Sequence, residues 1–181
     1  MNIKQLLIVT ILLFSSAAYG QTEFDETKLL AEQGNSFAQY NLGVMYENGE
    51  GVSENDADAV KWYRLAAEQG RARAQNNLGV MYENGEGVPE NDAETIKWFR
   101  LAAGKGNASA QLNLGFMYFD GDGVPQNNVR AYVWWSVAAV QGHENAKYNR
   151  DIVFEQLTPA LRGQAQQIAT KCFESDYKDC E

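Results

Sequence analysis

The chain has 181 residues, of which 45% are hydrophobic and 3 are proline, so its composition excludes an intrinsically disordered protein and suits one ordered domain. Its formal net charge is -9 at pH 7, and no basic stripe runs along the sequence. Because nucleic-acid binding requires clustered Lys and Arg side chains, we expect no nucleic-acid partner.

The first twenty residues have the features of a secretory signal peptide. Lys4 supplies a positive charge, residues 6–14 are almost entirely apolar, and the small residues Ala18 and Gly20 precede a cut at Gln21. The apolar run is much shorter than the ~20 residues that cross a bilayer as a helix. We predict a signal peptide over 1–20, export to the periplasm or the medium, and no stable membrane insertion after cleavage. An uncleaved anchor or a buried helix is the alternative.

One stretch of sequence occurs three times at a spacing of 36 residues. NLGVMYENGEGV at 41–52 returns unchanged at 77–88, and returns as NLGFMYFDGDGV at 113–124. A fixed period of this size is typical of a protein built by stacking one structural unit on the next. The predicted array occupies 34–145, with units at 34–69, 70–105 and 106–141 followed by the start of a fourth.

The first half of each unit is predicted to be a helix with one apolar face. In the first unit the residues at i, i+4, i+7 and i+8 are Ala38, Leu42, Met45 and Tyr46. A glycine follows the leucine each time, at positions 43, 79 and 115. Glycine inside a helix costs about 1 kcal/mol, so we expect it to permit close approach of a neighbouring helix.

The second half of each unit is predicted to be a helix that begins near Asn55, Asn91 or Asn127. A short polar side chain at this point can accept hydrogen bonds from the free amides of the first turn. This helix carries an aromatic pair, Trp62 and Tyr63 in the first unit. Neither helix alone can bury its aromatic face, so successive pairs must stack and complete one another's core.

Both ends of the array depart from the repeat. Residues 21–33 are predicted to form an N-terminal capping helix, and 146–181 to form C-terminal capping helices that restart at Thr158 as N-cap and Pro159 in the first turn. Cys172 and Cys180 are predicted to form a disulfide because the chain is expected to be exported. The alternatives, a metal pair or a redox motif, lack a paired His and the C-x-x-C spacing.

The repeated pattern resembles that of a known family. A-x-x-x-L-G-x-M-Y-x-x-G-x-G-V followed by A-x-x-W-Y/F-R-x-A-A-x-x-G is similar to the Sel1-like repeat, a relative of the tetratricopeptide repeat, over roughly 28–146. The resemblance implies an all-α fold, a right-handed α-solenoid of stacked antiparallel helix pairs with about three full repeats and terminal capping helices. It also implies a protein-binding scaffold of the exported bacterial type.

Catalysis is not expected from these residues. The G-x-G loops lack the remainder of a dinucleotide fingerprint, and His143 is the single histidine. We expect no catalytic, metal or cofactor site, and hence no enzyme. An exported, cysteine-rich subset of the family is linked to β-lactamase-like activity, but its hallmark cysteine pair is missing from all three repeats. Such an envelope hydrolase, or a self-associating structural protein, is the alternative to a monomeric scaffold.

The resemblance also indicates which face binds. In tetratricopeptide arrays the first helix of each unit lines the concave side, where this chain would bind an unidentified protein or peptide. The Asn residues of this face could bond a peptide backbone, or could equally bond adjacent loops or water. Its phenylalanines could contact a partner or pack under the C-terminal helix. The predicted protein-binding residues are Phe37, Tyr40, Asn41, Arg73, Asn76, Asn77, Leu112, Asn113, Phe116 and Phe119.

Overall fold

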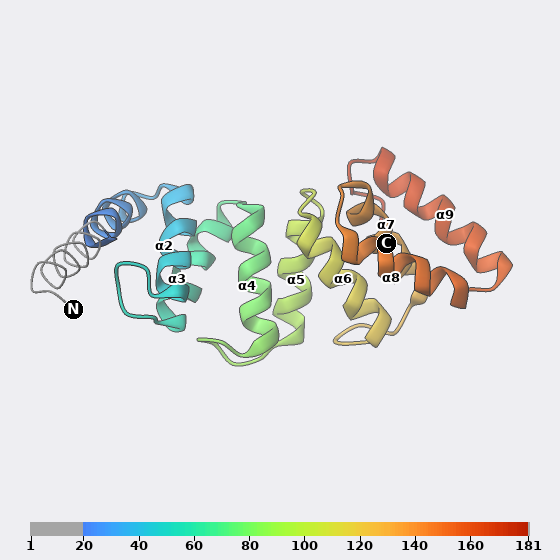
Figure 1. Ribbon diagram of the computed structural model, residues 1–181, viewed down its shortest axis with the longest axis horizontal. Helices are drawn as coiled ribbons and strands as arrows, with labels where there is room; N and C mark the ends of the chain where they lie inside the picture. The colour runs from blue at the N-terminus through green and yellow to red at the C-terminus, as the bar shows by residue number, and fades with distance from the viewer. Residues whose placement is uncertain (1–19, 181) are drawn as a thin grey trace, which may run out of the picture.

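The computed structural model describes residues 20–180, and over that range the chain forms helices joined by short turns (Figure 1). Residues 20–32 are helical. The predicted all-α fold is confirmed for this part of the chain. The later helices are α2 Ser36–Asn48, α3 Asp56–Glu68, α4 Ala72–Asn84, α5 Asp92–Ala103, α6 Ala108–Asp120, α7 Asn128–Val140, α8 Glu144–Gln156 and α9 Pro159–Glu174.

The helices are arranged as an elongated row of antiparallel pairs. The pairs α2 with α3, α4 with α5 and α6 with α7 follow one another along the long axis in Figure 1. Successive helices from α2 to α8 pack against one another. The predicted helical solenoid is therefore confirmed, and the repeat period corresponds to one helix pair.

The glycine-rich loops connect the two helices of each unit. Gly85 ends α4 in the left-handed conformation, with φ of 72°, and its amide donates to the carbonyl of Met81. The second glycine, Gly87, lies so close to α3 that a Cβ there would be 2.4 Å from the carbonyl oxygen of Asp56. The G-x-G motif thus combines a helix stop with close packing on the preceding unit.

Asparagine caps start the second helices, as predicted. The side-chain oxygen of Asn55 accepts from the amide of Asp58 at 3.2 Å. Asn91 and Asn127 make the equivalent bond at the starts of α5 and α7. Each cap satisfies an amide of the first turn that has no intrahelical partner.

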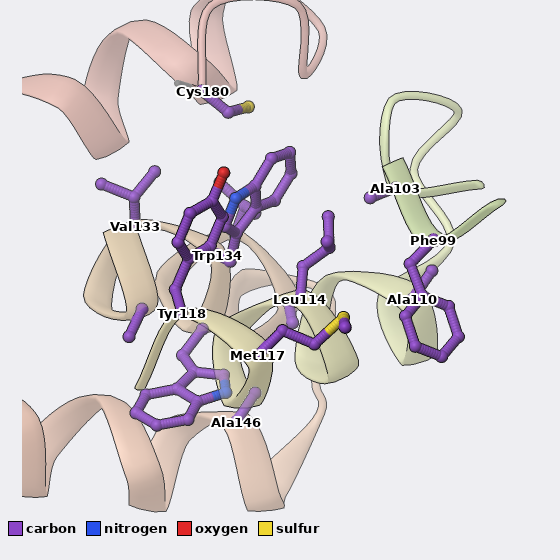
Figure 2. Packing of buried hydrophobic residues seen from close by; sticks show 14 of the residues in the cluster. Phe99, Ala103, Ala110, Leu114, Met117, Tyr118, Val133, Trp134, Ala146 and Cys180 are labelled. Atoms are coloured by element: carbon purple, nitrogen blue, oxygen red, sulfur yellow. The ribbon is translucent and has the colours of Figure 1, made fainter. Parts of the chain in front are cut away.

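The core lies between the helices of each pair and between successive pairs. Leu42, Leu78 and Leu114 are at most 1% exposed. Figure 2 shows Leu114, Met117 and Tyr118 of α6 directed into the same cluster as residues of α5 and α7. The mid-helix glycines lie under aromatic rings, since a Cβ on them would be at most 2.6 Å from the rings of Tyr63, Phe99 and Trp135 respectively. The predicted packing role of these glycines is confirmed.

A buried glutamine ladder, which the sequence analysis missed, links the units. The side-chain amides of Gln39, Gln75 and Gln111 donate to backbone carbonyls eight residues earlier at 3.0 to 3.1 Å. Gln69 donates in turn to Gln39, and Gln141 to Gln111. The corresponding residue of the middle unit, Lys105, donates instead to the carbonyl of Gly70 at 2.6 Å. The side-chain oxygen of Gln75 is consequently buried without a hydrogen bond.

The C-terminal helix α9 folds back over α7 (Figure 1). Thr158 caps it, accepting from the amide of Leu161, and proline stands in its first turn, as predicted. The α7 residues Val133 and Val137 are at most 1% exposed. Since their counterparts in α5 are the exposed Lys97 and Leu101, the change to valine marks the helix that α9 covers.

The predicted disulfide is present. Cys172 and Cys180 are bonded and both are buried against the core of the third unit. The predicted signal peptide lies outside the described residues except for Gly20. Between residues 20 and 180, no helix has both the length and the apolar character needed to span a membrane.

Candidate functional site

The candidate site is the surface of α2, α4 and α6 that faces away from the buried leucines, which we call the first-helix face. Its aromatic residues Phe37 and Phe116 are 55% and 38% exposed. Arg73 is exposed, and the remaining members are half-buried. This face is defined by the ten residues predicted to bind protein: Phe37, Tyr40, Asn41, Arg73, Asn76, Asn77, Leu112, Asn113, Phe116 and Phe119.

Three of these residues meet at a pocket where α2 adjoins the start of α4. The pocket has a volume of about 440 Å³ and is lined by Phe37, Tyr40, Arg71, Ala72 and Arg73. The guanidinium of Arg71 lies 4.9 Å from the centre of the Phe37 ring. Arg71 was absent from the predicted site, although its sequence carries a signal: arginine stands where the other units have Asn35 and Asn107.

A hydrogen-bond network underlies the neighbouring part of the face. The hydroxyl of the buried Tyr63 donates to the carboxylate of Glu47, and Asn77 also bonds that hydroxyl. Burial, followed by the hydrogen bond to Glu47, raises the pKa of Tyr63 far above its ordinary value. The Tyr40 ring packs against Tyr63 with centres 5.8 Å apart. Tyr63 therefore acts as a fixed donor that holds this part of the face in place.

One asparagine of the face is bonded within the protein. Asn77 is engaged inside the protein, because it bonds Tyr63 and also accepts from the side chain of Asn76 at 3.4 Å. The side chains of Asn41 and Asn113 are half-buried. Asn77 consequently stabilises the contact between units, and its use by a peptide would require breaking that network.

The phenylalanines of the third unit pack against α7. The Phe116 ring meets Trp135 edge to face at 5.3 Å, and the Phe119 ring lies 5.6 Å from the same indole. The indole nitrogen of Trp135 donates to the carbonyl of Leu112 at 3.1 Å. Both rings therefore contact Trp135 of α7. Phe116 is exposed, whereas Phe119 is half-buried and packs against the core.

Acidic groups gather at the other end of the face, where α4 and α6 end. Desolvation, followed by the carboxylates of Asp122 and Asp92, raises the pKa of Glu83 above its ordinary range. In the part of the chain described here, no three His, Cys, Asp or Glu side chains are placed together to hold a metal ion. The face is therefore charge-polarised, with arginines near the start of α4 and carboxylates near its end.

Comparison with known proteins places this geometry in context. The Sel1 repeat model matches residues 36–70, 72–107 and 108–143. The crystal structure of a protective antigen from uropathogenic Escherichia coli strains, described as an SLR fold, is 46% identical with a TM-score of 0.71. That match covers 73% of this chain and 28% of the antigen, so this chain spans well under half of the antigen's length.

A second solved structure matches over nearly its whole length. A Sel1 repeat protein from Oxalobacter formigenes is 40% identical with a TM-score of 0.65, and the match covers 71% of this chain and 97% of that one. No curated protein gives a significant match.

Proposed function

The chain belongs to the Sel1 repeat family, whose members generally serve as protein–protein interaction scaffolds, and we propose that it binds a protein or peptide through the first-helix face. The units are nearly copies of one another, yet this face differs from unit to unit. Phe37, Arg73 and Ser109 occupy one equivalent position, and Val44, Val80 and Phe116 another. The buried positions beneath them hardly vary, so the variation is concentrated where a partner would make contact.

The exposed aromatic rings are the observation that carries this proposal. Phe37 and Phe116 present 55% and 38% of their surface to solvent, on helices whose packing is fixed by the glycines and the buried network beneath. Aromatic side chains held in place in this way lose little conformational entropy on binding, and they dominate protein interfaces. A stacked array also presents them along an extended line, which suits an extended partner.

We further propose that the protein acts after export, in the periplasm or outside the cell. The apolar segment before Gln21 and the Cys172–Cys180 disulfide both support this location, since disulfides persist in oxidising compartments. The proposed role is non-catalytic, in line with the generally non-catalytic scaffolds of the family. The partner itself is expected to be another protein, and the chain is proposed to be a monomer.

The experiment compares two surfaces of the same protein. The chain without residues 1–20 is immobilised beside a Phe37→Ser, Phe116→Ser variant and a matched control, Leu65→Ser, Leu101→Ser. The control residues lie on the second helices and are 37% and 44% exposed. We expect a partner from the host's envelope extract to bind the native protein and the control, and to be lost by the first variant. Loss in the control alone would move the site to the second helices. Circular dichroism verifies that all three remain helical.

A further inference from the structure

We propose that the pocket lined by Phe37, Tyr40, Arg71 and Arg73 binds a carboxylate of the partner, next to an apolar side chain. This inference rests on the proposed function, because it names the chemistry that one part of the first-helix face recognises. The pocket lies where α2 adjoins the start of α4, and its volume of about 440 Å³ falls within the usual range for ligand pockets.

The two arginines are a departure of the second unit from its neighbours. Arg71 replaces Asn35 and Asn107, whose side chains cap the helices that follow them. Asn35, for example, accepts the amides of Phe37 and Ala38 at 3.0 Å each. Arg71 gives α4 no side-chain cap. The middle unit has therefore given up a stabilising cap and places a guanidinium beside the pocket instead.

Both guanidinium groups are available to a ligand. Among residues 20–180, neither Arg71 nor Arg73 forms an ion pair, although the chain has 24 acidic residues against 15 basic ones. The Nε atom of Arg71 is buried and has no hydrogen-bond acceptor. Buried donors normally have a partner in the native state. A carboxylate at the exposed part of this guanidinium would therefore not have to displace an acceptor of the protein.

The walls of the pocket favour a carboxylate beside an apolar group. The Phe37 ring lies against the Arg71 guanidinium and is more than half exposed, so it offers apolar contact area next to the charge. A guanidinium presents parallel N–H donors that match the two oxygens of a carboxylate. The ligand class is thus a peptide carboxylate, supplied either by a chain terminus or by an Asp or Glu side chain with an apolar neighbour.

NMR titration with small probes distinguishes a terminal carboxylate from a side-chain carboxylate. N-acetylphenylalanine carries a terminal carboxylate, N-acetyl-aspartyl-phenylalaninamide carries a side-chain carboxylate, and N-acetylphenylalaninamide carries none. We expect at least one acid to shift the guanidinium signals of Arg71 and Arg73 and the amide of Ala72, with a millimolar Kd. The amide probe should bind at least about tenfold more weakly, as expected when a charge-assisted pair is lost. Equal binding of all three probes, no shift from either acid, or stronger binding of inorganic phosphate would overturn the proposal.

A double substitution provides a control against unfolding. Arg71→Asn with Arg73→Ser installs the residues that stand at the equivalent positions of the third unit, Asn107 and Ser109. The new cap should raise the melting temperature by about 2 to 4 °C, while the response to both acids is lost. A variant that binds the acids as well as the native protein contradicts the inference. If a partner binds the first-helix face but tolerates this variant, the inference fails while the proposed function stands. If the partner binds only the second helices, the proposed function fails.

Discussion

Adding one methyl group to the mid-helix glycine of the third unit tests how the repeats pack. In an exposed helix, Gly→Ala stabilises by about 1 kcal/mol. Gly115→Ala is expected to do the opposite. Its Cβ would lie 2.2 Å from the indole nitrogen of Trp135 and 2.3 Å from the adjacent ring carbon, whereas carbon atoms in contact are about 3.5 to 4.0 Å apart.

The ring has little freedom to move away. Trp135 is 2% exposed, is flanked by Phe116 and Phe119, and donates to the carbonyl of Leu112. Overpacking a core costs about 1 to 3 kcal/mol, and displacing the indole weakens a partly buried hydrogen bond worth about 1 kcal/mol. After subtraction of the helix-propensity gain, Gly115→Ala should lower the free energy of unfolding by about 2 kcal/mol.

Gly163 in α9 provides the matched control, because a Cβ there would meet no atom within 4 Å. Gly163→Ala should therefore raise the free energy of unfolding by about 1 kcal/mol. Urea denaturation at constant temperature measures both variants, and an unchanged m-value shows that the midpoints report stability. The reasoning would be refuted if Gly115→Ala were as stable as the native protein, or if both substitutions changed stability in the same direction.

Three further predictions concern polar groups and the disulfide. Lys105→Gln should raise the free energy of unfolding, measured by urea denaturation, by about 1 kcal/mol, because the new side-chain amide supplies the donor that the buried oxygen of Gln75 lacks. An unchanged free energy of unfolding would mean that the new amide does not reach that oxygen. Because folding raises the pKa of Glu83, its ionisation opposes folding as pH rises above the usual carboxyl value near 4.3. Glu83→Gln should therefore raise the free energy of unfolding slightly at pH 7 but not at about pH 3. An equal increase in the free energy of unfolding at both pH values would contradict this prediction. Replacing Cys172 and Cys180 by Ser should lower the free energy of unfolding by about 2 to 3 kcal/mol. A reductant should lower the free energy of unfolding of the native protein to the same value.

The features predicted from sequence are those that depend on local chemistry or on the period. The caps at Asn55, Asn91 and Asn127 follow from the side chain alone. The glycine at position 115 could be assigned a packing role because its cost inside a helix requires a compensating contact. Thr158 followed by proline is a local signal that favours a helix start. None of these predictions needed the relative placement of distant residues.

The features missed depend on contacts between units. The sequence repeats Gln39, Gln75 and Gln111 in phase, but only the stacked structure shows that the row is buried and bonded to the preceding helix. The packing of α9 on α7 could have been inferred from Val133, which stands where α5 has a lysine. Arg71 escaped notice because its role depends on Phe37 of the preceding unit. In a repeat protein, the residue that departs from its equivalents is the most informative one.

Site-specific photo-crosslinking tests the proposed binding face most directly. A photoreactive phenylalanine analogue is placed at position 37 on the first-helix face and, separately, at position 65 on the second helix of the same unit. Both native side chains are exposed, so neither substitution should disturb the fold. In cells of the host, position 37 should give a discrete adduct with another protein, and position 65 should not. An adduct at position 65 alone would contradict the assignment of the first-helix face as the binding surface.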